Sequence, residues 1–282
     1  MYSNQFYTPL RYPGGKSKFA PFISDIIKEN KIAGGHYLEP YAGGAGVALY
    51  LLLEKYVSHI HINDIDPGIY SFWQAVLNDT DKLLKLIHDT PINMEQWFYW
   101  RDVMNGKTPA TSTEIGFATL FMNRTNRSGI LKAGVIGGKS QSGQYKLGDR
   151  FKKYVISKRI EKIALHRDQI SLYSKDALAF LKECHRFIPK KSLIYLDPPY
   201  YVKGQGLYRN FYNHEDHLAI ATQLQSAEFG VPWIISYDDV PEIRSMYKDC
   251  FKKKYDLHYI AQKRYIGKEI MFFSKSVSTP NH

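Results

Sequence analysis

The stretch LIYLDPPYY, Leu193–Tyr201, joins an apolar run to a carboxylate and two prolines. The run Leu193–Leu196 is typical of a strand that is buried on both faces in a parallel sheet. Asp197 follows at the point where such a strand leaves the sheet. Pro198 and Pro199 fix their φ angles and have no N–H to donate, so the carbonyls before them stay free as acceptors. The stretch therefore predicts a rigid group of oxygen acceptors, with an aromatic face beside it, at the end of a buried strand.

Strands and helices alternate along the chain on both sides of this stretch. The other expected strands are HYLEPY, SHIHINDID, QISLYS and VPWIISYDD, and a helix is expected after each. This alternation is typical of an α/β protein with a parallel sheet. The last two strands, KKKYDLHYIAQ and KEIMFFS, predict an antiparallel hairpin joined by a short turn that contains Gly267.

The alternation stops in the middle of the chain, from about residue 79 to residue 167. Helical stretches such as TDKLLKLIHD and TEIGFATLFMNR lead there into a segment rich in glycine and lysine. The simplest organisation is one α/β domain, residues 1–79 and 168–282, interrupted by an inserted module at residues 80–167.

The composition bounds the partners and the setting of the protein. The 282 residues carry 38 Lys and Arg against 27 Asp and Glu, a formal net charge of +11. This balance favours a polyanionic partner, nucleic acid first and an anionic membrane surface second. Two cysteines are too few for a disulfide framework or a cysteine-based metal site. We find no secretory signal and no apolar run of membrane-spanning length, so we expect a cytoplasmic setting.

The stretch EPYAGGAG, Glu39–Gly46, places glycines directly after a strand and at the start of a helix. Glycines there let the backbone turn sharply and approach a ligand closely. Asp64 ends the next strand roughly 20 residues later, where nucleotide-binding folds place an acid on a ribose hydroxyl. Because the spacing is neither GxGxxG nor a P-loop, an adenosine without phosphates is favoured over a pyrophosphate. The alternative is a plain tight turn and an aspartate that caps a helix.

Asp176 and Asp197 are carboxylates that could meet a nucleobase. Asp176 follows the strand QISLYS and could accept the amino group of an adenine, or only cap the next helix. At Asp197, the carboxylate and the Pro198 carbonyl could accept both N–H groups of an exocyclic amine, which aims the nitrogen lone pair at an electrophile. Tyr200 offers a ring for stacking, and the base must leave the duplex to reach it. The alternative is a Pro-Pro turn with an incidental aspartate.

Four stretches follow one another along the chain: LRYPGGKSK, EPYAGGAG, the strand ending in HINDID, and LDPPYY. In this order they resemble the motifs of the Dam-type, alpha-group DNA adenine-N6 methyltransferases, which use S-adenosyl-L-methionine. SKDALAFL and KEIMFFS also fit that family. The resemblance implies a Rossmann-like methyltransferase fold, with a mostly parallel seven-stranded sheet that ends in an antiparallel hairpin. It also implies that the inserted segment is a helical target-recognition module.

The resemblance assigns roles residue by residue. The catalytic tetrapeptide is Asp197, Pro198, Pro199 and Tyr200. The positions that match the methyl-donor site are Tyr12, Gly14, Lys16, Glu39, Pro40, Gly43, Gly44, Gly46, Asp64, Asp176 and Asp197. In this set, the glycine turn is expected around the methionine part of the donor and Asp64 at its adenosine part. Tyr41 stands where family members often carry Phe, a change that should keep the packing.

The inserted segment is expected to bind DNA through basic and amide side chains. The candidates are Arg124, Asn126, Arg127, Lys132, Lys139, Lys146 and Arg150. Lysine and arginine suit phosphate contacts, and arginine and asparagine can read base edges bidentately. The alternative for any single one of them is a solvated surface position. The stretch NRTNRSGIL does not match the pattern of members that read GATC.

Taken together, we expect a monomeric, metal-independent enzyme that transfers a methyl group from S-adenosyl-L-methionine to N6 of a flipped-out adenine at specific sites in double-stranded DNA. No membrane and no obligate protein partner are expected. One alternative is another amine substrate: cytosine N4, adenine in RNA or a protein amide. The other is a catalytically silent DNA-binding protein with the same fold.

Two polar stretches have competing interpretations. NHEDH, Asn213–His217, could hold a metal, but Asn213 as a helix N-cap with Asp216 three residues on is the commoner pattern. SYDD, Ser236–Asp239, ends a strand on the same sheet edge as Asp197, where it could border the base pocket or simply terminate the strand.

Overall fold

The structure is a computed structural model that describes residues 7–11, 16–202, 212–261 and 263–280, with the backbone alone described at 256–261 and 263–268. The chain divides into two compact units. The described residues of the first lie within Lys16–Asp66 and Gln169–His282, and those of the second within Tyr7–Gly15 and Pro67–Asp168.

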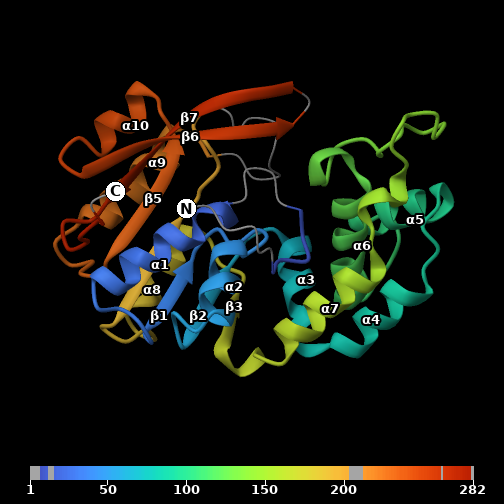
Figure 1. The fold of residues 1–282 in the computed structure, drawn as a ribbon, viewed down its shortest axis with the longest axis horizontal. Helices are drawn as coiled ribbons and strands as arrows, with labels where there is room; N and C mark the ends of the chain where they lie inside the picture. Colours follow the sequence, from blue (N-terminus) through green and yellow to red (C-terminus); the bar gives the residue numbers. More distant parts are fainter. Residues whose placement is uncertain (1–6, 12–15, 203–211, 262, 281–282) are drawn as a thin grey trace. The chain divides into compact units, whose positions relative to one another are not determined.

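The first unit is built on a seven-stranded sheet in the order β3-β2-β1-β4-β5-β7-β6 (Figure 1). The strands are β1 (His36–Glu39), β2 (His59–Asn63), β3 (Ile170–Tyr173), β4 (Ser192–Leu196), β5 (Trp233–Asp238), β6 (Phe251–Ala261) and β7 (Lys263–Phe273). The strands β1 to β5 pair in parallel, and β7 is antiparallel to both β5 and β6. The expected α/β, Rossmann-like fold with a mostly parallel sheet and a closing hairpin is confirmed.

The strand β4 lies between β1 and β5 and is buried along its whole length, as its apolar run predicts. Because the carboxyl ends of parallel strands meet at one edge of a sheet, Glu39, Asn63 and Leu196 bring the chain to the same edge. The predicted position of the final turn is wrong. Gly267 lies within β7 opposite Leu257, and Ala261 pairs with Lys263 at the end of the hairpin.

Helices cover both faces of this sheet. They are η1 (Lys16–Phe19), α1 (Ala20–Glu29), α2 (Gly46–Leu53), α8 (Ala177–Cys184), α9 (His214–Gln225) and α10 (Pro241–Met246). Apolar side chains of α8, α9 and α10 form one core cluster with alternate residues of β4, including Ile194 and Leu196. Tyr195, between them, projects to the opposite face because successive strand residues alternate. The core therefore holds β4 from both sides.

The second unit is helical. It contains α3 (Pro67–Asn78), α4 (Thr80–Asp89), α5 (Met94–Met104), α6 (Ser112–Thr125), α7 (Lys153–Ala164) and the short turns η2 (Arg127–Gly129) and η3 (Leu147–Arg150), while η4 (Arg167–Gln169) spans the boundary with the first unit. A capping box between Thr111 and Glu114 starts α6. The lack of a side chain at Gly116 lets α6 approach α3, since a Cβ there would lie 2.5 Å from the Ser71 carbonyl oxygen. This packing groups α3 with the helices that follow it.

No helix among the described residues combines the length and the apolar character needed to cross a bilayer.

Candidate active site

The glycine turn after β1 is closed by Asp64, at the end of β2. Gly43 has a φ of 46°, in the left-handed region that favours glycine. Its N–H donates to Asp64 Oδ2 at 2.8 Å, and the Asp66 N–H donates to Asp64 Oδ1 at 2.9 Å. Burial raises the pKa of the Asp64 carboxyl to about 6, against the two backbone hydrogen bonds. Asp64 therefore closes the turn through backbone hydrogen bonds, and a contact with a ribose hydroxyl stays a prediction.

The turn leads into α2 through a close contact with η1. A Cβ at Gly46 would lie 2.0 Å from the Ser17 Oγ, so only glycine fits there without a rearrangement. Pro40 and Gly44 are buried beside this turn. The stretches KSK and AGGAG, which lie far apart in the sequence, are thus packed against each other.

Glu39 is buried beneath the turn. Its Oε1 accepts hydrogen bonds from the Ala48 N–H at 3.0 Å and from the Tyr37 hydroxyl at 3.2 Å. Burial raises the pKa of Glu39 to about 8, so the carboxyl is mostly protonated at neutral pH. In this position Glu39 joins β1 to the first turn of α2.

Asn63 is a buried residue that the sequence analysis missed. Its Nδ2 donates to the Pro40 carbonyl at 2.9 Å and to the Lys175 carbonyl at 3.0 Å, and its Oδ1 accepts the Lys175 N–H at 2.9 Å. One side chain thus ties together the ends of β1, β2 and β3. The available signal was a polar residue at the end of an otherwise buried strand.

Asp176 is exposed and caps α8. Its Oδ1 accepts the N–H groups of Leu178 at 3.0 Å and Ala179 at 3.1 Å. The capping interpretation is therefore confirmed, and a contact with adenine stays a prediction.

Asp197 lies directly after β4, with its side chain 25% exposed. Its Oδ1 accepts a hydrogen bond from Ser236 Oγ at 3.0 Å and lies 3.3 Å from Lys16 Nζ. Burial raises the pKa of Asp197 to about 6, while Lys16 lowers it and Glu269 raises it. The carboxylate is thus fixed by a neighbouring strand and by a buried cation.

Lys16 connects the N-terminal motif to the tetrapeptide. Its ammonium donates to the Tyr200 hydroxyl and lies 3.1 Å from Glu269 Oε2, with only 2% of the side chain exposed. Lys16, Asp197 and Tyr200 are therefore brought together, as are Glu39, Gly43 and Asp64 around the turn. In this arrangement the Lys16 ammonium faces the tetrapeptide. The family resemblance had assigned Lys16 to the methyl-donor site, and that contact stays a prediction.

Glu269 on β7 is a second residue that the sequence analysis missed. It is fully buried, and its Oε2 accepts a hydrogen bond from the Tyr255 hydroxyl at 2.7 Å. The available signal was an acid within the apolar stretch KEIMFFS, a residue type that is rarely buried without a partner.

The backbone after Tyr200 is held by Asp238 of β5. Asp238 Oδ1 accepts the Tyr201 N–H and Oδ2 accepts the Val202 N–H, each at 3.0 Å. Ser236 and Asp238 lie two residues apart and project from the same face of β5. Of the two interpretations of SYDD, the structure supports the one that borders the Asp197 site.

The NHEDH stretch forms a helix cap. Asn213 Oδ1 accepts the Asp216 N–H at 3.0 Å, and Asp216 Oδ2 accepts the Asn213 N–H at 2.9 Å. Across the part of the chain that the structure describes, no three His, Cys, Asp or Glu side chains are grouped so as to hold a metal ion.

Two of the expected DNA contacts form hydrogen bonds within the helical unit. Asn126 is 0% exposed, and its amide accepts the Trp97 Nε1–H at 2.8 Å and donates to the Leu131 carbonyl at 2.9 Å. Arg124 donates from Nε to the Pro9 carbonyl at 2.7 Å, and burial lowers its pKa to about 9. The buried, fully engaged Asn126 does not fit the expectation that it contacts DNA, whereas the contact expected of the half-buried Arg124 stays a prediction.

The other expected DNA contacts are exposed. They are Arg127, Lys132, Lys139, Lys146 and Arg150. The Arg150 guanidinium lies 5.6 Å from the ring centre of Tyr145, which is itself exposed. Tyr12 and Gly14, which were expected at the methyl donor, lie outside the described residues.

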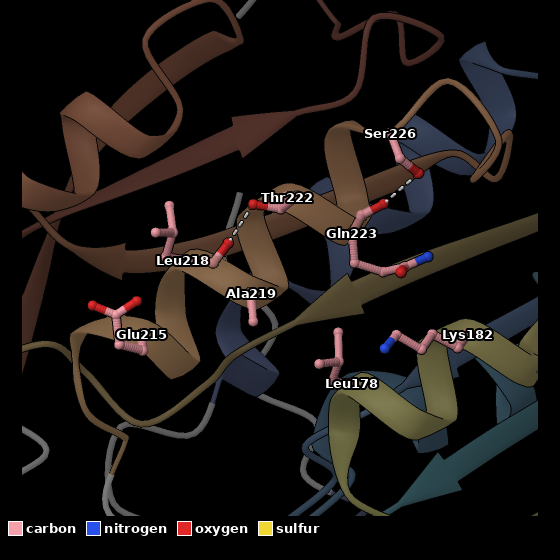
Figure 2. A pocket seen from close by; sticks show the side chains of 8 residues that line it. All are labelled: Leu178, Lys182, Glu215, Leu218, Ala219, Thr222, Gln223 and Ser226. Atoms are coloured by element: carbon pink, nitrogen blue, oxygen red, sulfur yellow. Dashed lines mark hydrogen bonds between the residues drawn. The ribbon is translucent and has the colours of Figure 1, made fainter.

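A separate surface pocket of about 430 Å³ lies between α8 and α9 (Figure 2). Its described lining is Leu178, Lys182, Glu215, Leu218, Ala219, Thr222, Gln223 and Ser226. Lys182 and Glu215 extend from different helices at its rim, and none of these side chains belongs to the Asp197 or glycine-turn clusters. The pocket therefore adds nothing to the candidate active site.

The chain is similar to several known proteins. It is 24% identical over 267 residues to the retron Ec67 DNA adenine methylase of Escherichia coli, a match that covers 92% of this chain and 85% of the relative. It is 22% identical over 207 residues to the type II methyltransferase M.MjaIII of Methanocaldococcus jannaschii, which covers 68% of each chain. A proposed RNA methyltransferase of known structure, PH1948 from Pyrococcus horikoshii, matches 94% of this chain and 86% of its own at 11% identity and a TM-score of 0.42.

The family model for the D12 class N6 adenine-specific DNA methyltransferases matches residues 12–266. This range includes the glycine turn, Asp64, Asp197 and residues 67–168 of the helical unit. With most of its length matched, the chain belongs to the D12 class N6 adenine-specific DNA methyltransferases.

Proposed function

We propose that this adenine methyltransferase takes its methyl group from S-adenosyl-L-methionine and transfers it to N6 of an adenine flipped out of double-stranded DNA at a specific site. The observation that carries the proposal is the placement of Asp197 at the carboxyl end of β4, fixed by Ser236 and by Lys16.

The residues around the glycine turn suit a methyl donor that carries an adenosine. Gly43 forms the turn in the left-handed region, Gly46 lets η1 pack against it, and Asp64 stands beside the turn at a strand end. Although both Asp64 oxygens accept a backbone N–H, each carboxylate oxygen has a further lone pair for a ribose hydroxyl. When bound, the donor would supply a methyl group on a positively charged sulfur, which is already a good leaving group.

Asp197 and Pro198 would prepare the nucleophile. The N6 lone pair of adenine is conjugated into the ring, which makes the amine a poor nucleophile. Two oxygen acceptors, the Asp197 carboxylate and the Pro198 carbonyl, would take its two N–H groups and turn the lone pair toward the methyl carbon. The donor would give up its methyl carbon to N6, and the electron pair of the broken C–S bond would stay on sulfur. The extra proton on N6 then leaves, and Asp197, whose pKa is raised to about 6, is placed to accept it.

Tyr200 would stack on the extruded base. Its hydroxyl accepts a hydrogen bond from Lys16, so the ring is held in one orientation. Base–aromatic stacking contributes roughly 1–3 kcal/mol per base. Extrusion is required because the amine is otherwise paired inside the duplex.

The helical unit would bind the DNA backbone. Its exposed basic side chains, Arg127, Lys132, Lys139, Lys146 and Arg150, suit phosphate contacts, and the net charge of +11 favours a polyanion. Asn126 is not among these contacts, because its polar groups are engaged within the unit.

The proposal is tested by identifying the product. The protein is incubated with methyl-labelled S-adenosyl-L-methionine and double-stranded DNA of mixed sequence, and the DNA is digested to nucleosides. We expect the label in N6-methyladenine. Label in N4-methylcytosine, or DNA binding without any transfer, would contradict the proposal and favour one of the alternatives.

A further inference from the structure

Glu269 is a buried acid to which the proposed reaction gives no role. It is 0% exposed on β7, and two of its partners, Lys16 Nζ at 3.1 Å and the Tyr255 hydroxyl at 2.7 Å, lie on Oε2. Within the described residues, Oε1 is buried without a hydrogen-bond partner. A buried carboxylate oxygen without a partner is costly, so Glu269 is expected to lower the stability of the fold.

The sheet fixes Glu269 close to Asp197. Glu269 is paired with Asp238 of β5 on one side and with Tyr255 of β6 on the other. Paired residues on neighbouring strands project from the same face, and so does Ser236, two residues before Asp238. Ser236 and Glu269 therefore reach the Lys16–Asp197 pair from the same face of the sheet.

The Lys16 ammonium is shared between two acids. It lies 3.1 Å from Glu269 Oε2 and 3.3 Å from Asp197 Oδ1. With Asp197 as its single acid partner, the ammonium would move closer to that carboxylate and occupy its lone pairs, in competition with the adenine amine. Glu269 draws the ammonium in the opposite direction.

We propose that Glu269 is a positioning residue of the methyl transfer: by holding the Lys16 ammonium between two carboxylates, it keeps the Asp197 carboxylate available as an acceptor for the adenine amine. The effect of Glu269 on methyl transfer rests on the proposed function. Its effect on the pKa of Asp197 can be measured in the free protein.

The charge around Asp197 comes mainly from Lys16 and Glu269. The other titratable groups that face it are Tyr37, Glu39, Tyr195, Tyr200 and Tyr255. Burial raises the pKa of each of these tyrosines well above its ordinary value, and that of Glu39 to about 8, so all are mostly neutral at pH 7. Removing the Glu269 charge should therefore lower the pKa of Asp197, and removing the Lys16 charge should raise it.

The test compares Glu269→Gln and Lys16→Met with the wild-type protein. In Glu269→Gln we expect kcat to fall roughly 10–100-fold, the size of effect that misplacement of a reacting group produces. We also expect the acidic limb of the kcat/KM profile to move to lower pH. In Lys16→Met that limb should move to higher pH. A role in packing alone would not move the two limbs in opposite directions.

Two controls separate charge from packing. Tyr255→Phe removes a hydrogen bond to Glu269 but no charge, so its acidic limb should stay at the wild-type pH. Glu183→Gln removes an exposed acid that pairs with Lys175, and it should behave like wild type in rate and profile. An acidic limb that moved equally in Glu183→Gln would overturn the assignment to Glu269.

A measurement without DNA or donor keeps the inference independent of the proposed function. The Asp197 carboxyl carbon is titrated by ¹³C NMR in the free wild type, in Glu269→Gln and in Glu269→Asp, the last of which keeps the charge. The inference predicts a lower Asp197 pKa in Glu269→Gln than in the wild type, and little change in Glu269→Asp. An unchanged Asp197 pKa in folded Glu269→Gln would overturn it. Absence of N6-methyladenine from the wild type would instead overturn the proposed function.

Discussion

Asp197 is the proposed acceptor for the adenine amine, so its ionisation state should make kcat/KM depend on pH. Burial raises the pKa of Asp197 to about 6. Only in the ionised carboxylate can both oxygens act as acceptors for an N–H of the amine. We expect kcat/KM to be highest above pH 6 and to fall as the pH drops below about 6, tenfold per pH unit once Asp197 is mostly protonated. The measurement is the initial rate at low substrate concentration from pH 5 to pH 8. A flat profile with the fold intact by circular dichroism would contradict it.

Some residues of the candidate site could be predicted from the sequence, and others could not. Asp197 and Asp64 were found because each follows an apolar strand, and the structure puts each at the carboxyl edge of the sheet. Glu269 and Asn63 were missed because their significance comes from partners distant in the chain, Lys16 and Lys175. A single sequence does not give such pairings.

Between elements, the contact of η1 with α2 depends on Gly46. In Gly46→Ala the new Cβ would lie 2.0 Å from Ser17 Oγ, so the Ser17 hydroxyl must rotate away or one of the two segments must shift. We expect a loss of about 1–3 kcal/mol in the free energy of unfolding, and weaker binding of S-adenosyl-L-methionine by calorimetry. Adding Ser17→Ala removes the clashing oxygen and should restore part of both.

The matched control is Gly148→Ala, in η3. There a Cβ would meet Ile92 at 3.4 Å, an ordinary van der Waals distance, and donor affinity should be unchanged. Equal effects of the two substitutions on donor binding would show that the η1–α2 contact does not shape the donor site.

The link between β1 and α2 through Glu39 gives a second prediction at this scale. The pKa of Glu39 is raised from 4.5 to about 8 by burial. Between these two values the folded state holds a proton that the unfolded state has lost, so the free energy of unfolding falls as the pH rises. The slope from this group is at most about 1.4 kcal/mol per pH unit.

Glu39→Gln should remove that part of the slope, because the amide stays neutral and its oxygen can still accept the Ala48 N–H. Urea unfolding of both proteins from pH 5 to pH 8 measures the difference. Parallel stability curves for the two proteins would show that Glu39 titrates as it does in the unfolded chain.

The sequence predicted most elements because local pattern and packing agree in them. The helix cap expected at Asn213 is present at the start of α9 (His214–Gln225). The hairpin turn was misplaced because Gly267 was taken as a turn residue, whereas Arg264–Ile266 continue the pairing with β6. The helix α5 was not foreseen, because the exposed aromatic residues Phe98 and Tyr99 obscure the pattern of its buried face.

At the scale of the whole molecule, the positive charge should act through DNA phosphates. Replacing Arg127, Lys132, Lys139, Lys146 and Arg150 with Gln should weaken DNA binding at low salt. It should also reduce the slope of log K against log salt concentration, by about 0.9 for each phosphate that the protein no longer neutralises. Binding is measured by fluorescence anisotropy at several salt concentrations, with donor affinity as the internal control. An unchanged slope would remove these side chains from the interface.

In the helical unit, position in the sequence does not distinguish the side chains proposed to face DNA from those that hold the fold together. Arg124, Asn126 and Arg127 lie within four residues, yet Asn126 is fully buried and Arg127 is exposed. The Asn126 amide joins the loop at Leu131 to Trp97 of α5, a pairing of distant residues that the sequence alone does not reveal. Asn126→Ala should therefore lower stability and leave the salt slope unchanged.

The most direct test of the central claim is single-turnover methyl transfer by the wild type and by Asp197→Ala, with labelled donor and DNA and with the product identified after digestion to nucleosides. The account predicts N6-methyladenine from the wild type, and a rate at least about 1,000-fold lower from Asp197→Ala, which still binds donor and DNA in part. Transfer by Asp197→Ala at the wild-type rate would contradict it.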